Sequence, residues 1–300
     1  MKASKSSSGK SAESWLSQNP STSRPAAAAG VFVNLPVLNE AENVGSLLDS
    51  LERELNGIAH TICVIDDGSR DGTAEIVEAK IAQVGPRIQL LRRKKTERGC
   101  QRGAALLHGL RWGLAHTSHG IFVEIDGDFS HRPEELPTGI GLIESGHYDV
   151  VVASKYLKGS RTTNRPIGRR LVSAICNIGV RSFVSRSVSD YSNGYRFYSR
   201  EAGAIVAGHV IRHGSPIYLT EAMAIWLVHR QRVGEFPTVY VGRNEGLSKV
   251  QWVDLVKGAF AVFEVAFRFH LTGFMERPIP LVPVPGNEAV QDSPPGVPPR

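Results

Sequence analysis

Apolar residues recur along this chain in two alternating patterns. Short runs rich in β-branched residues predict buried strands, and longer segments whose apolar residues return every three or four positions predict helices. The predicted strands cover residues 31–35, 61–65, 88–91, 120–125 and 149–153. The predicted helices cover residues 43–55, 72–84 and 103–115, and another begins at Pro133 and ends near Gly146. This alternation predicts an α/β fold, a mostly parallel, Rossmann-like sheet with helices on both faces.

The domain organisation follows from length and local composition. A chain of 300 residues, 41% of them hydrophobic, can bury one large core or two small ones. We expect a single catalytic domain over residues 30–250, followed by an amphipathic helix over residues 251–275 that packs on the domain or lies in a membrane interface. Residues 1–29 are rich in Ser, Ala and Lys, and residues 276–300 are rich in Pro, so both are expected to be disordered.

The charge balance narrows the range of partners. The formal net charge is +6, and the basic residues are scattered rather than gathered in one block. No nucleic-acid-binding motif accompanies them, so we expect phosphorylated small molecules and no nucleic acid. The three widely spaced cysteines suit a reducing compartment. The longest apolar stretch, residues 258–263, is far shorter than the ~18 residues of a transmembrane helix. We therefore expect a protein without such a helix, in the cytoplasm or at the cytoplasmic membrane face.

Polar side chains follow three of the predicted strands. Asn39 and Glu40 follow the first strand, Asp66 and Asp67 follow the second, and the sequence Asp126-Gly127-Asp128 follows residues 120–125. The carboxyl ends of parallel strands meet at one edge of the sheet, where such folds bind ligands. A carboxylate pair can hold a divalent cation against a diphosphate, although Asp is also common in turns. Neither a dinucleotide-binding G-x-G-x-x-G after the first strand nor a P-loop is present.

These segments resemble a known family. Residues 36–40, 66–69 and 126–135 are similar, in order, to the motifs of GT-A fold, family 2 inverting glycosyltransferases. The dolichol- or polyprenyl-phosphate mannose synthase-like branch is indicated by residues 153–156, 170–177, 190–196 and 243–249. The resemblance extends over roughly residues 31–250. Several motifs in the same order make it far more specific than any single motif.

The resemblance implies a role for each matching residue. Mg²⁺ or Mn²⁺ would be held against the donor diphosphate by Asp126 and the catalytic Asp128. The residues expected beside the nucleotide are Pro36, Asn39, Glu40, Asp67 and Asp126. The residues expected at the acceptor phosphate or the diphosphate leaving group are Lys155, Arg170, Arg196, Arg243, Ser248 and Lys249. Arg196 is also expected to act in catalysis.

Three positions depart from the pattern of the branch. Gly127 stands where Ala is usual, which is expected to loosen the loop. Ser130 stands where a Gln often joins the metal ligands, and its side chain is shorter. Lys155 stands where Arg is usual and cannot form the same two-pronged contact with a phosphate. The histidines, His131 included, show no metal-binding spacing and are expected to be structural.

The resemblance implies transfer of mannose from GDP-mannose to a polyprenyl phosphate, with peripheral membrane contact. Two alternatives remain: a UDP-sugar or a soluble hydroxyl acceptor used by the same fold, and a nucleotide-sugar-binding protein without activity. A hydroxyl acceptor requires a general base, for which Glu221 is the candidate. The other interpretation of Glu221, which we favour slightly, is an acidic residue at a helix start, with Thr220 as the cap.

Overall fold

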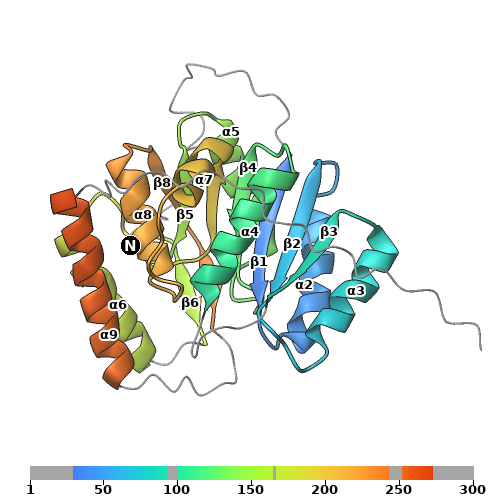
Figure 1. Cartoon of the computed structure of the whole chain (residues 1–300), viewed down its shortest axis with the longest axis horizontal. Helices are drawn as coiled ribbons and strands as arrows, with labels where there is room; N and C mark the ends of the chain where they lie inside the picture. Colours follow the sequence, from blue (N-terminus) through green and yellow to red (C-terminus); the bar gives the residue numbers. More distant parts are fainter. Residues whose placement is uncertain (1–29, 94–100, 165–166, 243–251, 273–300) are drawn as a thin grey trace, which may run out of the picture.

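A seven-stranded sheet forms the centre of the molecule (Figure 1). The computed structural model describes residues 30–93, 101–164, 167–242 and 252–272, and only the backbone of residues 167–172 and 252–259. The strands lie in the order β3-β2-β1-β4-β7-β5-β8. Their bounds are β1 Val31–Val37, β2 His60–Asp66, β3 Ile88–Arg92, β4 Ile121–Glu124, β5 Val150–Ser154, β7 Arg196–Ser199 and β8 Val233–Pro237. A small parallel pair, β6 Arg161–Thr163 and β9 Val239–Val241, lies apart from this sheet.

The sheet is mostly parallel, as the sequence predicts. Only β7 runs antiparallel to its neighbours, β4 and β5. In the parallel part, Val37 at the end of β1 pairs with Asp66 at the end of β2. Asn34 of β1 pairs with Glu124 at the end of β4. The loops that follow β1, β2 and β4 therefore leave the sheet from one edge, which is where the sequence predicts the site.

Helices cover both faces of the sheet and bury its two sides separately. The bounds of these helices are α2 Ala41–Glu54, α3 Thr73–Val84, α4 Arg102–His116, α5 Leu136–Glu144, α7 Arg200–Ala207 and α8 Tyr218–Val228. On β1, Phe32 packs into the core under α4, α7 and α8, whereas Val31 and Val33 pack into the core under α2, α3 and α5. The central strands β1, β4 and β5 are buried on both sides, so they read as largely apolar runs.

Two further helices lie beyond α8, at the side of the molecule away from β3 (Figure 1). They are α6 Ile167–Phe183 and α9 Trp252–Phe267, and α9 continues into one π-helical turn, Arg268–Thr272. The rings of Phe183 and Phe263 meet at 4.9 Å between the two helices. Together α9 and the π-helical turn cover residues 252–272 of the segment for which an amphipathic helix is expected. No helix in the described ranges is long and apolar enough to cross a membrane.

Several elements depart from the predictions. α8 begins at Tyr218, so Thr220 lies inside the helix and does not cap it. This helix is buried on all sides from Tyr218 to Trp226, so no apolar stripe marks it in the sequence. The strands β6, β8 and β9 and the short 3-10 turn Pro133–Glu135 before α5 were not predicted. The predicted disordered segments, residues 1–29 and 276–300, lie outside the described residues.

Candidate functional site

The loops after β1 and β2 are fastened to each other. The backbone N–H of Asn39 donates to Ser69 Oγ at 2.9 Å, and Asn39 Oδ1 accepts from the backbone N–H of Arg70 at 2.9 Å. The backbone of Asn39 has a φ of 55°, a left-handed conformation that Asn tolerates well. The side chain of Asn39 therefore holds the two loops together beside the expected nucleotide position.

Two acidic residues at this edge are nearly buried and engaged. The backbone N–H of Glu40 donates to Thr73 Oγ1 at 2.8 Å, and its carboxylate accepts from Asn43 at 2.9 Å. Asp67 forms an ion pair with Arg93 at 2.7 Å, and its backbone N–H donates to Val37 O at 3.1 Å. The structure thus brings these predicted nucleotide-side residues to one edge, where hydrogen bonds and an ion pair hold them.

The loop that carries the aspartate pair packs directly on β1. A Cβ on Gly127 would lie 2.8 Å from Cγ1 of Val37 and 3.1 Å from the carbonyl oxygen of Pro36. A real Cβ atom does not approach that closely without displacing its neighbour. Gly127 therefore allows the loop after β4 to approach the end of β1 closely, which corrects the expectation that it loosens the loop.

Asp126 and Asp128 are both partly exposed, and each has a defined partner. Asp126 forms an ion pair with Arg102 through Oδ1, and its Oδ2 lies 3.2 Å from Nε2 of His131. Asp128 Oδ1 accepts from the backbone N–H of Ser130 at 3.0 Å in a tight turn. His131 is 1% exposed, so the expected structural histidine is in fact a neighbour of the candidate metal ligand.

The charge state of Asp126 follows from these neighbours. Burial alone raises the pKa of Asp126, but the positive charge of Arg102, the hydrogen bond from His131 and the more distant Lys155 outweigh burial. Together they hold the pKa of Asp126 well below its usual range. Asp126 is therefore an anion near neutral pH, as a ligand of a divalent cation must be.

The two aspartates fit a cation that also binds the donor. No group of three or more His, Cys, Asp or Glu side chains with metal-binding geometry occurs in the part of the chain that the structure describes. Mg²⁺ and Mn²⁺ do not need one, because they take their remaining ligands from substrate phosphates and water. Ser130 Oγ is buried, and no described residue hydrogen bonds to it.

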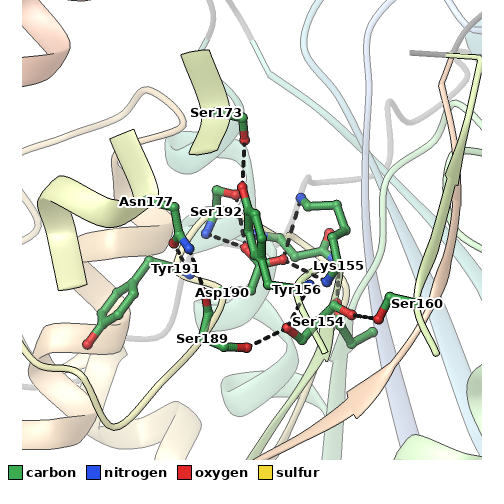
Figure 2. A network of polar contacts seen from close by, with 12 residues as sticks. Ser154, Lys155, Tyr156, Ser160, Ser173, Asn177, Ser189, Asp190, Tyr191 and Ser192 are labelled. Atoms are coloured by element: carbon green, nitrogen blue, oxygen red, sulfur yellow. Dashed lines mark hydrogen bonds and ion pairs between the residues drawn. The ribbon is translucent and has the colours of Figure 1, made fainter. Parts of the chain in front are cut away.

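A second group of polar side chains surrounds Asp190, beyond the end of β5 (Figure 2). Asp190 is fully buried, and its carboxylate accepts from the backbone N–H groups of Lys155, Ser192 and Asn193 at 2.9–3.0 Å. The Lys155 ammonium lies 3.7 Å from Asp190 and 5.2 Å from the ring centre of Tyr240. The predicted phosphate ligand Lys155 is therefore fixed between a carboxylate and an aromatic ring.

The polar side of α6 faces this group. Asn177 Nδ2 donates to the carbonyl of Ser189 at 2.5 Å, and Asn177 Oδ1 accepts from the backbone N–H of Tyr191 at 3.0 Å (Figure 2). The Ser173 hydroxyl lies 3.3 Å from the Tyr156 hydroxyl. Ser173 and Asn177 of α6 therefore face the protein, whereas Ile175 and Ile178 on the same helix are exposed.

Arg196 was expected to meet a phosphate, and the structure contradicts direct contact. Its side chain is 0% exposed and donates to the backbone carbonyls of Tyr191, Asn193 and Leu219 at 2.7–2.9 Å. An arginine in a strand core needs such partners because an unpaired buried charge is costly. Arg196 joins β7 to the segments on either side of the site, so it supports the site without reaching it.

Glu221 also differs from its predicted role as a base. Its carboxylate is fully buried, pairs with Arg268, and accepts from the backbone N–H groups of Arg212 and His213 at 3.1–3.2 Å. It sits in the first turn of α8, where the helix dipole favours an acid. The alternative of a helix-start acid is therefore the one that the structure supports.

Four predicted phosphate ligands are not described in full. The backbone of Arg170 belongs to α6, but its side chain lies outside the described part. Arg243, Ser248 and Lys249 lie outside the described residues altogether.

Two residues close to the aspartate pair were not predicted: Arg102, which is part of the site, and Glu124, which is buried beside it. Arg102 begins α4 and reaches Asp126, yet a single Arg at a helix start has no distinguishing pattern. Glu124 ends β4 fully buried, and its Oε1 accepts from the hydroxyls of Tyr198 and Tyr218, both at 3.1 Å. Burial raises the pKa of Glu124, and the charge of Arg196 offsets only part of that rise. The one available signal was an acidic residue within an otherwise apolar strand.

Comparison with known proteins agrees with this geometry. The Glycosyl transferase family 2 model matches residues 33–203. Polyprenol monophosphomannose synthase of Mycolicibacterium smegmatis is 28% identical over 261 residues, which cover 86% of this chain and 94% of that protein. Dolichol-phosphate mannosyltransferase of Pyrococcus furiosus is 34% identical over 224 residues, which cover 74% of this chain and 59% of that protein.

A solved structure supports the fold. Glucosyl-3-phosphoglycerate synthase from Mycobacterium tuberculosis, in complex with Mn²⁺, uridine-diphosphate-glucose and phosphoglyceric acid, matches with a TM-score of 0.59 at 19% identity. The match covers 79% of this chain and 80% of that chain. The mostly parallel sheet with its covering helices is the fold of the GT-A class of glycosyltransferases. The chain belongs to glycosyltransferase family 2, which confirms the resemblance, and it is a glycosyltransferase.

Proposed function

We propose that this enzyme transfers mannose from GDP-mannose to a polyprenyl phosphate, with Mg²⁺ or Mn²⁺ held by Asp126 and Asp128. The observation that carries the proposal is the aspartate pair at the sheet edge, with Arg102 and Lys155 near Asp126. The printed names of the relatives, a polyprenol monophosphomannose synthase and a dolichol-phosphate mannosyltransferase, support the sugar and the acceptor class.

The proposed reaction is a single displacement. An oxygen of the acceptor phosphate attacks the anomeric carbon of the sugar, and the bond from that carbon to the donor diphosphate breaks. The sugar is then bonded to the acceptor phosphate with inverted configuration, and GDP leaves with the electron pair. A bound divalent cation would supply charge stabilisation for the leaving diphosphate. Positively charged side chains that are already in position stabilise the same charge in the transition state.

The state of Glu221 supports an anionic acceptor. A sugar hydroxyl must lose a proton to a base, whereas an acceptor phosphate is already an anion. Glu221 was the candidate base, but its carboxylate is buried, forms an ion pair with Arg268 and accepts hydrogen bonds from two backbone N–H groups. A phosphate acceptor does not require this carboxylate.

We further propose that the outward face of α6 and α9 rests on the membrane that carries the lipid acceptor. Large apolar side chains on this face are exposed by 45–70%, although apolar groups are usually buried. They are Ile175, Ile178, Phe183, Phe260, Phe263, Phe267 and Leu271, and we call them the apolar face. A contiguous exposed apolar surface is typical of contact with a membrane or a protein.

Vesicle binding tests the apolar face. The double variant Phe260→Ser/Phe267→Ser should weaken binding to anionic vesicles about tenfold or more, since each Phe side chain that enters the membrane contributes about 1.5–3 kcal/mol. Ile58→Ser is a matched control, because Ile58 is also exposed but lies between α2 and β2. Equal binding by the double variant and the control would contradict membrane docking through this face.

The main test is transfer from a panel of labelled nucleotide sugars to a short polyprenyl phosphate, with Mn²⁺, Mg²⁺ or EDTA. We expect label from GDP-mannose in the organic phase, dependent on the cation and lost in Asp128→Asn. Label from UDP-glucose would change the donor and keep the reaction. Donor hydrolysis without a lipid product would replace the lipid by a soluble acceptor. Absence of both products would contradict the proposed function.

A further inference from the structure

The guanidinium of Arg102 sits on the carboxylate that is proposed to hold the cation. Its Nη2 pairs with Oδ1 of Asp126, and the Arg102 side chain is 20% exposed. The other oxygen of Asp126 faces His131 Nε2 at 3.2 Å. Both oxygens of this proposed metal ligand therefore already have a partner from the protein.

Gly194 provides the space for this guanidinium. A Cβ on Gly194 would lie 1.7 Å from Nη2 of Arg102 and 2.8 Å from its Cζ. The neighbouring Asn193 fixes the segment, since its backbone N–H donates to Asp190 at 3.0 Å and its side chain donates to Ala153 O. No side chain larger than that of Gly fits while Arg102 stays on Asp126.

Arg102 can still donate a further hydrogen bond. Its Nε is buried and has no hydrogen-bond acceptor among the described residues. A guanidinium can bind a phosphate through two parallel N–H groups, and it keeps its positive charge at any physiological pH. The group that neutralises Asp126 is thus equally suited to a diphosphate.

A divalent cation at Asp126 meets this guanidinium as a competitor. Both are positive, so they repel each other, and both require oxygens of the same carboxylate. A diphosphate changes the balance, because it offers an anion to the guanidinium and further oxygens to the cation.

We propose that Arg102 competes with the divalent cation for Asp126 and thereby makes tight cation binding depend on the donor. Without donor, the ion pair neutralises Asp126 and keeps the affinity for the cation low. With donor, Arg102 turns to the diphosphate and Asp126 is released to the cation. By linkage, the cation strengthens diphosphate binding by the same factor. The proposal rests on the metal-dependent transfer proposed above and assigns Arg102 as a residue that couples donor binding to cation binding.

Mn²⁺ titration monitored by the electron paramagnetic resonance signal of free Mn²⁺ tests this coupling without an activity assay. The titration is done on the intact protein, alone and with GDP. For the wild type we expect weak binding alone and at least about tenfold tighter binding with GDP. For Arg102→Gln we expect the affinity of the protein alone to rise about five- to tenfold, with a smaller effect of GDP.

Two further variants separate charge from shape. Arg102→Lys keeps the charge and should stay near the wild type. Gly194→Ala leaves Arg102 in the sequence but displaces its guanidinium, the flexible end of a side chain, and its φ is compatible with Ala. It should raise the Mn²⁺ affinity of the protein alone in the same direction as Arg102→Gln. A thermal melt of each variant verifies that it is folded.

The outcomes distinguish this proposal from the proposed function. If Arg102→Gln binds Mn²⁺ no more tightly than the wild type while GDP still enhances binding, the competition is refuted and the transfer reaction stands. If no variant binds Mn²⁺ even with GDP or UDP, metal-dependent transfer fails and the competition fails with it.

Discussion

Glu124 and Asp126 lie two residues apart at the end of the same strand, and their surroundings shift the pKa of the two carboxyls in opposite directions. Glu124 is 0% exposed, and its Oε1 accepts from two tyrosine hydroxyls. The Asp126 side chain is 21% exposed and lies against Arg102 and His131. The pKa of Glu124 is raised by its burial, whereas the pKa of Asp126 is lowered because its cationic neighbours outweigh its burial. Neighbours and solvent therefore decide which of the two carboxylates is available to a ligand.

The strongest test of the difference between Glu124 and Asp126 is to replace each carboxylate by its amide. Asp126→Asn should lower transfer about 10³-fold, since it weakens binding of the cation that stabilises the leaving diphosphate. Glu124→Gln should keep transfer within a few-fold of the wild type, because Glu124 touches only protein groups. Initial rates with saturating Mn²⁺ measure both. Similar losses in the two variants would mean that Glu124 also belongs to the reacting site.

A second test truncates the buried side chain of Glu124. Glu124→Ala leaves the hydroxyls of Tyr198 and Tyr218 unpaired and takes a carboxyl group away from Arg196, its partner on β7. Breaking such a buried set should lower the free energy of unfolding by about 3–5 kcal/mol. Urea unfolding measures this effect, with Glu124→Gln as the control that keeps a polar group of the same shape. A loss under about 1 kcal/mol would contradict a structural role for Glu124.

The two pKa shifts predict opposite dependences of stability on pH. A carboxyl whose pKa is raised by folding releases its proton first in the unfolded chain, so Glu124 lowers stability as pH rises above its unfolded pKa of about 4.3. A carboxyl whose pKa is lowered by folding acts in reverse, so Asp126 adds stability that is lost as pH falls below about 3.9.

Urea unfolding from pH 3 to pH 7 measures both slopes. Glu124→Gln should remove a decline of up to about 1.4 kcal/mol per pH unit that begins above about pH 4.3. Asp126→Asn should remove the loss below about pH 3.9. A Glu124→Gln curve that runs parallel to the wild type between pH 4.5 and pH 7 would show that the environment of Glu124 does not favour the protonated form.

The smallest expected effect concerns the loop that presents Asp126. Gly127→Ala puts a methyl group 2.8 Å from Val37, so the two loops must separate slightly. We expect a loss of about 1–3 kcal/mol of stability and a weaker affinity for the donor. Gly141→Ala in α5 is the matched control, since a Cβ there meets nothing within 4 Å. Equal stability of the two variants would show that Gly127 is not needed for close packing.

The sequence was sufficient for the strands β1 to β5 and for the position of the aspartate pair. Residues 31–35, 61–65 and 120–125 are apolar enough to identify the strands, and polar loops after parallel strands share an edge. The placement of β7 between β4 and β5 was beyond reach, because strand order depends on long-range packing. For the same reason Arg196 was expected at a phosphate: a motif does not reveal that its charge is satisfied by three backbone carbonyls.

The α6 helix illustrates the same limit. Its sequence separates a polar row, with Ser173 and Asn177, from an apolar row, with Ile175 and Ile178. The sequence does not show which of the two rows faces the protein. In the structure Asn177 is buried and Ile175 and Ile178 are exposed, the reverse of a usual surface helix. Only the position of the loop at residues 189–191, which accepts and donates hydrogen bonds at Asn177, determines this choice.

Metal-dependent transfer at the Asp126-Gly127-Asp128 loop is the central claim, and one measurement tests it most directly. Wild-type enzyme is treated with EDTA, incubated with labelled GDP-mannose and a short polyprenyl phosphate, and supplied with Mn²⁺, beside Asp126→Asn. We expect Mn²⁺ to restore label in the organic phase for the wild type and not for the variant. Equal label with and without Mn²⁺, or equal label in the variant, would contradict the central claim.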